Sequence, residues 1–224
     1  MKSIKDYTEL YRKMYPELPE DKILAKATDK FNKISMIKEG KNIVLLEYYE
    51  GLITDSETLY IEELLKNENL ELNKFDKNGI PYASIQEFTL QMSLYINDPI
   101  IQNVLLGISG SAIWDALKSS AVFIWTKVKE RHWNSNEKRE SHTINFGFKY
   151  STKNGDRIDV NLNGDLSPEQ LNKALDILPT LISESNNVNH PMNSGFYYFD
   201  IDQNKWIGID VIEELKKRHY KRKK

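Results

Sequence analysis

The chain has 224 residues, of which 40% are hydrophobic and 29% charged, a composition typical of globular proteins rather than disordered or fibrous ones. It contains no cysteine, which excludes disulfides, zinc–thiolate sites and cysteine nucleophiles. The formal net charge is −2, but residues 216–224 hold seven Lys and Arg and no acid, so the rest of the chain has 24 basic against 33 acidic residues. The first residues lack the apolar core of a secretory signal, and we expect a cytoplasmic protein.

Residues 1–40 are expected to form a helical hairpin. Apolar residues three and four positions apart predict a first helix over residues 3–15, which Pro16 and Pro19 end. A second helix begins near Pro19, runs to about Lys38, and precedes Gly40. Its predicted apolar face consists of Ile23, Leu24, Ala27, Phe31 and Ile34. This hairpin is interpreted as a cap or as an arm that binds a partner.

Residues 41–131 are expected to form an α+β segment. A short apolar run at 43–46 predicts a buried strand, residues 57–66 a helix, and residues 70–75 a second strand. The clearest strand is predicted at 88–96, where apolar and polar residues alternate over nine positions.

The longest apolar run is residues 99–129, and we expect the rest of the chain to pack against it. Glycines at 107 and 110 divide it into a short helix and a long amphipathic helix over 111–130. A membrane span is an alternative on length, but Asp115, Lys118 and the glycine break argue against it. Small residues four positions apart also allow close approach of a neighbouring helix. The partner-binding candidates on this helix are Ala112, Ala116, Ser120, Trp114 and Trp125.

Residues 142–224 are expected to form a hairpin–helix–hairpin–helix domain, separated from the preceding segment by a polar stretch at 131–141. Alternating runs at 144–150 and 158–162 flank an Asn-Gly turn and predict a hairpin. Ser167, Pro168 and Gln170 form a capping-box pattern that predicts a helix start. A second hairpin is predicted from residues 196–201 and 206–211. The fold class is therefore predicted to be α+β, an N-terminal helical hairpin followed by antiparallel hairpin–helix units packed on a central amphipathic helix.

No motif in the chain meets the requirements of a known catalytic or cofactor site, and we predict no cofactor. Residues 107–111 lack the final glycine and the preceding strand of a nucleophile elbow. Residues 76–87 place the glycine of a calcium loop at the wrong position. The four histidines lack metal-ligand spacing. One alternative stays open, a metal-dependent hydrolase or nuclease that binds magnesium through Asp156, Asp159, Asp200 and Asp202.

The basic C-terminal tail, residues 216–224, differs most in composition from the rest of the chain. Its positive charges suit nucleic acid phosphates or an acidic protein surface, such as the acidic region 47–71 of this chain. The residues that carry this prediction are Lys216, Lys217, Arg218, Lys221, Arg222, Lys223 and Lys224.

Two stretches, GISGSAIWDALK at 107–118 and INFGFKY at 144–150 with the DRIDVNLNGDLSPEQLNKALDIL that follows, loosely resemble accessory modules of bacterial conflict and antiviral-defence proteins. The resemblance covers residues 107–185 and implies no catalytic residue. We therefore expect an intracellular, non-enzymatic protein that works through protein contacts or self-association, as an accessory or regulatory component. The alternatives are a nucleic-acid-associated protein that uses the tail, and the metal-dependent hydrolase.

Overall fold

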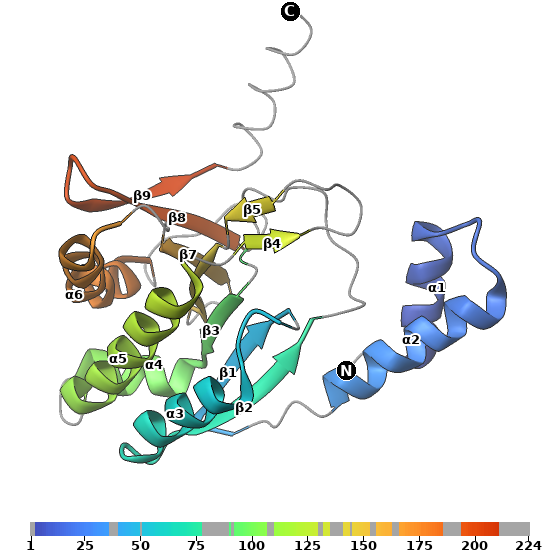
Figure 1. Ribbon diagram of the computed structural model, residues 1–224, viewed down its shortest axis with the longest axis horizontal. Helices are drawn as coiled ribbons and strands as arrows, with labels where there is room; N and C mark the ends of the chain where they lie inside the picture. Colours follow the sequence, from blue (N-terminus) through green and yellow to red (C-terminus); the bar gives the residue numbers. More distant parts are fainter. Residues whose placement is uncertain are drawn as a thin grey trace, which may run out of the picture.

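The computed structural model describes residues 3–35, 40–49, 51–77, 90, 92–106, 110–129, 132–134, 141–143, 145–152, 156–162, 166–185 and 194–210. A seven-stranded sheet is covered on one face by helices α3 to α6, and a helical hairpin lies beside it at the right of Figure 1. The predicted α+β class is confirmed.

The N-terminal hairpin consists of α1 (Ile4–Met14) and α2 (Glu20–Ser35), close to the predicted bounds. Ser3 caps α1 because its hydroxyl accepts from the Asp6 N–H, while the Asp6 carboxylate accepts from the Ser3 N–H at 2.7 Å. The hairpin has its own small core of Tyr7, Tyr11, Ile23 and Ala27. Leu24, predicted to be on the buried face, is 50% exposed.

The first part of the sheet is a β–α–β unit, in which β1 (Ile43–Tyr48) and β2 (Glu71–Asp76) are parallel and α3 (Asp55–Lys66) connects them. Thr54 caps α3, with the Glu57 carboxylate accepting from the Thr54 N–H at 2.9 Å. Ile61 and Leu65 of α3 are fully buried against the sheet.

Strand β3 (Met92–Ile96) lies inside the sheet, where it pairs antiparallel with β1 and parallel with β6 (Phe146–Ser151). The chain between β3 and β6 contains α4 (Asp98–Leu106) and α5 (Gly110–Val128), which confirm the predicted short and long helices. Residues 88, 89, 91, 107–109 and 130 of these predictions lie outside the described residues. Strand β4 (His132–Asn134) lies within the expected linker and pairs with β5 (Ser141–Thr143), which begins at the end of that linker, as a separate two-stranded ribbon.

The C-terminal part contains both predicted hairpins, β6 with β7 (Arg157–Leu162) and β8 (Ser194–Asp200) with β9 (Lys205–Ile209). Helix α6 (Pro168–Ser185) connects β7 to β8, which are parallel. The predicted capping box is present, since the Ser167 N–H donates to Gln170 Oε1 at 2.7 Å and the Gln170 N–H donates to Ser167 Oγ at 3.2 Å. The helix predicted after residue 211 lies outside the described residues.

One prediction about the fold was wrong, because the sheet is mixed rather than built from antiparallel hairpins alone. The strand order is β2-β1-β3-β6-β7-β8-β9, and its neighbouring pairs alternate between parallel and antiparallel. Each parallel pair is joined through one or two helices, because a chain that crosses a sheet through a helix returns in the same direction. The β3–β6 pair also joins the strands on both sides of the expected 131–141 boundary into one sheet.

The main core lies between the sheet and helices α3 to α6. Alternate residues of the four central strands point into it and are at most 1% exposed: Val44, Leu46, Met92, Leu94, Ile96, Phe146, Phe148, Tyr150, Ile158, Val160 and Leu162. The predicted buried face of α5 is confirmed, with Leu117, Ala121 and Ile124 fully buried. The predicted face of α6 is also buried, and Trp206 Nε1 on β9 donates to the carbonyl of Ala174 at 3.2 Å.

Candidate functional site

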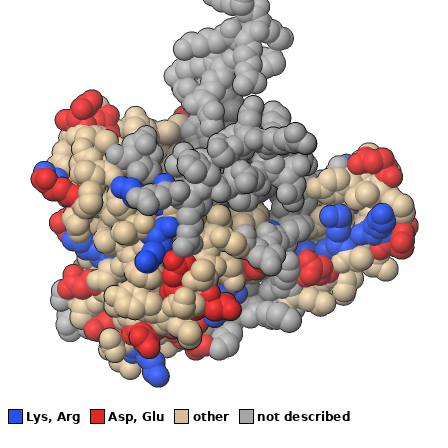
Figure 2. Space-filling view, viewed as in Figure 1, with Lys and Arg blue, Asp and Glu red and all other residues tan. Residues whose placement is uncertain are grey.

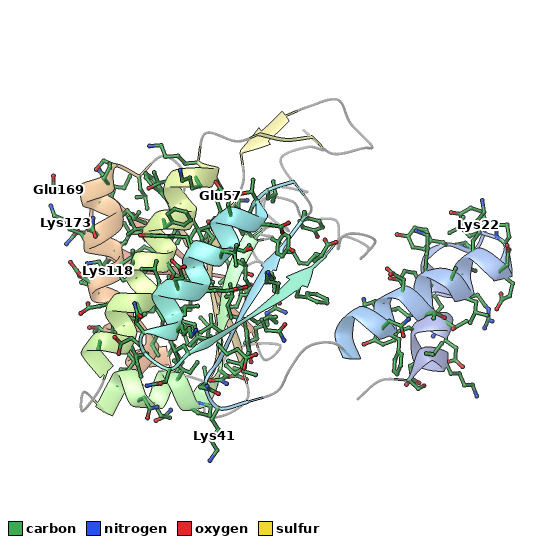
Figure 3. The ribbon with its side chains drawn as sticks, turned by 60° about the horizontal axis from the view of Figure 1, so that its bottom comes forward. Lys22, Lys41, Glu57, Lys118, Glu169 and Lys173 are labelled. Carbon is green, nitrogen blue, oxygen red and sulfur yellow. The ribbon has the colours of Figure 1, made fainter. Side chains whose placement is uncertain are left out.

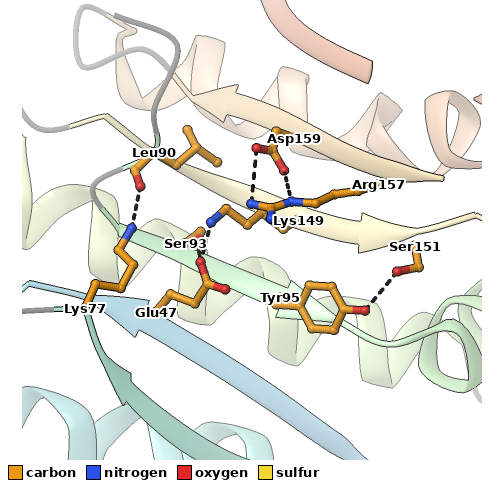
Figure 4. A network of polar contacts seen from close by, with 9 residues as sticks. All are labelled: Glu47, Lys77, Leu90, Ser93, Tyr95, Lys149, Ser151, Arg157 and Asp159. Carbon is orange, nitrogen blue, oxygen red and sulfur yellow. Dashed lines mark hydrogen bonds and ion pairs between the residues drawn. The ribbon is translucent and has the colours of Figure 1, made fainter. Parts of the chain in front are cut away.

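The face of the sheet opposite the helices has a group of charged and polar side chains at its centre (Figure 4). They come from adjacent strands, because the residues of β1, β3, β6 and β7 that alternate with the core residues point to this face. We call this group the polar cluster, and its members are Glu47, Lys77, Ser93, Lys149, Arg157 and Asp159.

At the middle of the polar cluster, Glu47 pairs with Lys149 and accepts a hydrogen bond from Ser93 Oγ at 3.1 Å. Ser93 is fully buried, Lys149 is 5% exposed, and the side chain of Glu47 is 16% exposed. Burial alone raises the pKa of Glu47, but the charge and hydrogen bond of Lys149 outweigh burial and hold the pKa below its usual value. The Glu47 carboxylate is therefore ionised at neutral pH.

Lys77 follows strand β2 and is 7% exposed. Its Nζ donates to the carbonyl of Leu90 at 2.6 Å and lies 4.7 Å from the centre of the Tyr49 ring. Burial, and then the positive charge of Lys149, lower the pKa of Lys77 to about 7. A large share of this amine is thus uncharged at neutral pH.

Arg157 and Asp159 belong to the polar cluster and lie on strand β7. Arg157 Nε donates to Asp159 Oδ1 at 3.0 Å, and the arginine side chain is 53% exposed. Beside them, Tyr95 Oη and Ser151 Oγ share a hydrogen bond of 2.8 Å. The cluster therefore presents three basic side chains against two carboxylates.

A second candidate site lies on the helical side of the molecule, as a groove of about 600 Å³ among α3, α5 and α6. We call it the docking groove, and it is lined by Tyr60, Asp115, Lys118, Ser119, Val122, Phe123, Thr126 and Asn172. The rings of Tyr60 and Phe123 lie 4.4 Å apart and form its aromatic end. Lys118 Nζ lies 2.5 Å from Asp176 Oδ1, which links α5 to α6, and Figure 3 shows this lysine near Glu169 and Lys173 of α6.

The partner-binding candidates on α5 lie in different surroundings. Ala112 is exposed and Ala116 is half-buried. Ser120 is fully buried, and Trp114 and Trp125 are 8% and 3% exposed, within the chain's own core. Only the two alanines of this set are therefore accessible. The basic candidates at 216–224 lie outside the described residues.

The four aspartates of the metal-site alternative are not brought together. Asp156 is buried, Asp159 pairs with Arg157, and Asp200 accepts from the Gln203 N–H at 2.9 Å. Within the described ranges, no three His, Asp or Glu side chains are grouped closely enough to hold a metal ion. Within the same ranges, no helix has both the length and the apolar character needed to cross a membrane.

Sequence reasoning missed most residues of both sites; it named Asp159, Asp115 and Lys118, but for other reasons. Val122 and Phe123 are apolar residues outside the buried face of α5. Tyr60 is an aromatic residue on the exposed side of α3. Apolar residues in such positions indicate a possible binding surface, and the docking groove could have been predicted from them. No short sequence pattern indicates the polar cluster, because its members are far apart in the chain. Lys77 lies 30 residues after Glu47, and Lys149 lies 102 residues after it.

Comparison of the chain with protein-family models, with curated protein sequences and with solved structures found no match.

Proposed function

We propose that this chain is a protein-interaction component, accessory or regulatory in role, that binds a basic and apolar segment of a partner protein in the docking groove. The observation that carries the proposal is Tyr60 of α3, an aromatic side chain that lines the groove and is 45% exposed. The resemblance of residues 107–185 to accessory modules supports the same role.

The exposed apolar side chains favour a partner because their burial releases water from apolar surface. Covering an exposed leucine or aromatic side chain is worth about 1.5–3 kcal/mol. Tyrosine is also among the residues that contribute most to protein interfaces. Tyr60, with the Phe123 ring 4.4 Å from its own, offers such an anchor site.

The charges around the groove favour a basic partner. Helix α3 contains four acids, Asp55, Glu57, Glu62 and Glu63, against Lys66 alone. At the opposite side of the groove, Asp115 is exposed, while the basic lining residue Lys118 is already paired with Asp176 of α6. Figure 2 shows Asp and Glu side chains over the lower left of the molecule, where α3 and α5 lie. Lys and Arg on a partner segment would complement these charges and speed association.

The test is a selection of peptides from a random display library on the immobilised full chain. We expect the enriched peptides to combine Lys or Arg with aromatic or aliphatic residues. Their affinity for the Tyr60→Ala variant is expected to fall about 30-fold, since truncating an interface anchor costs about 2 kcal/mol.

The matched control is Leu24→Asp, because Leu24 is 50% exposed, close to the 45% of Tyr60, but lies on the N-terminal hairpin. Tyr60→Asp is expected to abolish binding of the selected peptides, whereas Leu24→Asp leaves it unchanged. Peptides that bind the Tyr60→Asp variant as well as the parent chain, or a library that yields no enriched peptide, would overturn the proposed function.

A further inference from the structure

Every described residue that lines the docking groove lies on an α-helix. Figure 3 shows α5 between α3 and α6, and α5 contacts both of them. Helix α5 contributes most of the lining residues, whereas α3 contributes Tyr60 and α6 contributes Asn172. The backbone N–H and C=O groups inside a helix are already bonded to each other. These helices therefore offer a bound segment their side chains, but no row of free backbone groups like the edge of a sheet.

This construction of the docking groove favours a helical partner segment. A segment that bound in an extended form would lose water from its backbone N–H and C=O groups without gaining partners for them, which is unfavourable. An α-helix avoids this cost, because its backbone groups bond within the segment. Amphipathic helices bind hydrophobic grooves of other proteins in this way.

The docking groove also has two chemically different ends. Tyr60 and Phe123, whose ring centroids lie 4.4 Å apart, form the aromatic end. Asp115 lines the groove eight residues before Phe123 on α5, which places the two residues about 12 Å apart along the helix axis at 1.5 Å per residue. An apolar side chain of a partner fits the aromatic end, and a Lys or Arg fits the end at Asp115.

Asp115 is the carboxylate that a basic side chain in the groove would meet. It is the only acid among the described lining residues, it is exposed, and it has no ion-pair partner within the described ranges. The basic lining residue Lys118 does not neutralise it, because Lys118 is paired with Asp176. Lys127 lies at the other end, where its Nζ is 5.6 Å from the centre of the Phe123 ring.

We propose that the partner segment binds as an α-helix of about three turns, with a large apolar residue and a Lys or Arg seven or eight positions apart. In a helix, about 12 Å corresponds to about eight residues, and positions seven or eight apart lie on the same face. In an extended segment, the same distance is only about four residues, at about 3.3 Å each. The proposal rests on the proposed function, because it describes the partner that the docking groove binds.

The experiment uses two display libraries of 16-residue peptides, selected together at equal input on the full chain. Each library fixes one Trp and one Arg, in either order, and leaves the other positions random. The two residues are seven positions apart in the first library and four apart in the second. We expect the first library to supply most of the enriched peptides, because only a helix with the longer spacing reaches both ends of the groove.

Proline substitution then tests the helix itself. Proline midway between Trp and Arg in an enriched peptide should weaken its binding about 100-fold, because proline inside a helix removes a hydrogen bond and clashes with the preceding turn. Proline at the first position of the same peptide is the control and should leave the affinity nearly unchanged, because the first turn of a helix accepts it.

A charge substitution tests the end of the groove at Asp115. Asp115→Asn should weaken binding of the enriched peptides about two- to fivefold, as expected for an exposed ion pair. The effect should disappear for peptides in which the fixed Arg is replaced by Gln. The control is Glu17→Gln, which removes an exposed acid from the N-terminal hairpin and should not change the affinity.

The outcomes separate this inference from the proposed function. Enriched peptides that depend on Tyr60 but tolerate the central proline, or that come mainly from the second library, would overturn the helical partner and leave the proposed function in place. Libraries that yield no enriched peptide would overturn both.

Two other occupants of the groove would also overturn the assignment to a separate partner. Tighter peptide binding by a variant with the seven basic residues of 216–224 changed to Gln would show that the chain's own tail occupies the groove. A dimeric parent chain that becomes monomeric with Tyr60→Asp, measured by light scattering, would assign the groove to a second copy.

Discussion

Lys149 on strand β6 forms an ion pair with Glu47 on strand β1, and the two side chains meet across strand β3, which lies between them. Ser93 on β3 donates to the same carboxylate, so three adjacent strands are connected by side chains as well as by their backbones. The two charged residues are 102 positions apart in the chain.

Removing one partner of this pair should destabilise the protein strongly. We expect Lys149→Met to lower the free energy of unfolding by about 3–5 kcal/mol, because it leaves the buried carboxylate of Glu47 without its counter-ion. Urea unfolding measures the loss. Arg12→Met is the control, since it breaks the exposed Arg12–Glu20 pair and should have little effect. Equal losses in the two variants would contradict the prediction.

The contribution of the same pair should depend on pH. Because Lys149 holds the pKa of Glu47 below the unfolded value of 4.5, the pair stabilises the fold fully above pH 4.5. This stabilisation is lost as the pH falls through the folded-state pKa. The difference in unfolding free energy between the parent and Lys149→Met should therefore shrink between pH 4.5 and the most acid pH at which the chain still folds. A difference that stays constant over this range would be inconsistent with an ionised Glu47.

Lys77 should oppose folding near neutral pH. Its folded-state pKa of about 7 is below the unfolded value of 10.5, so the unfolded chain binds more protons between these values and stability rises with pH across the window. We expect Lys77→Met to gain stability relative to the parent at pH 7 and to lose most of that gain by pH 10. Since one pKa unit corresponds to about 1.4 kcal/mol, the change should exceed about 1 kcal/mol in parallel denaturant titrations. A gain independent of pH would show that Lys77 has an ordinary pKa.

Gly147 should tolerate no side chain. A Cβ at this position on β6 would lie 1.8 Å from the carbonyl oxygen of Val160 on β7, and a backbone atom cannot rotate away. We expect Gly147→Ala to cost about 3 kcal/mol, at the upper end of the usual cost of overpacking. The control is Gly208→Ala, whose Cβ would lie 3.2 Å from the side chain of Tyr197. Similar midpoints for both variants in urea would contradict this account.

Ser120 should be replaceable without loss. Its hydroxyl is fully buried on α5 and has no hydrogen-bond partner among the described residues. Removing an unsatisfied hydroxyl avoids its desolvation cost, so Ser120→Ala should raise the free energy of unfolding by up to about 1 kcal/mol. Thermal unfolding would show a gain of about 2–4 °C for that amount. Ser120→Leu, which adds volume to the same buried position, should lower the midpoint, and a lower midpoint for Ser120→Ala would disprove the prediction.

The local elements were largely predictable because their signals are local. The alternation around Phe148 and Ile158 and the cap at Ser167 act over a few residues, and the structure confirms each of them. The pairing of β3 with β6 was not predictable from such patterns, because it depends on how α4 and α5 carry the chain back to the sheet. The polar cluster could not be predicted from local patterns either, because it depends on the same strand pairing. Glu47 and Lys149 look like ordinary surface charges until the strands that carry them are placed on either side of β3.

The position of β3 also has a consequence for synthesis of the chain from its N-terminus. When residue 96 has been made, β3 can pair with β1. Its other edge stays unpaired until residues 146–151, which form β6, have also been made. A ribosome that adds about 5–20 residues per second needs several seconds to cover this interval. For that time the growing chain carries an unfinished sheet, in which Met92, Leu94 and Ile96 lack one of their two neighbouring strands. This interval is when the new chain is most open to aggregation or to capture by a chaperone.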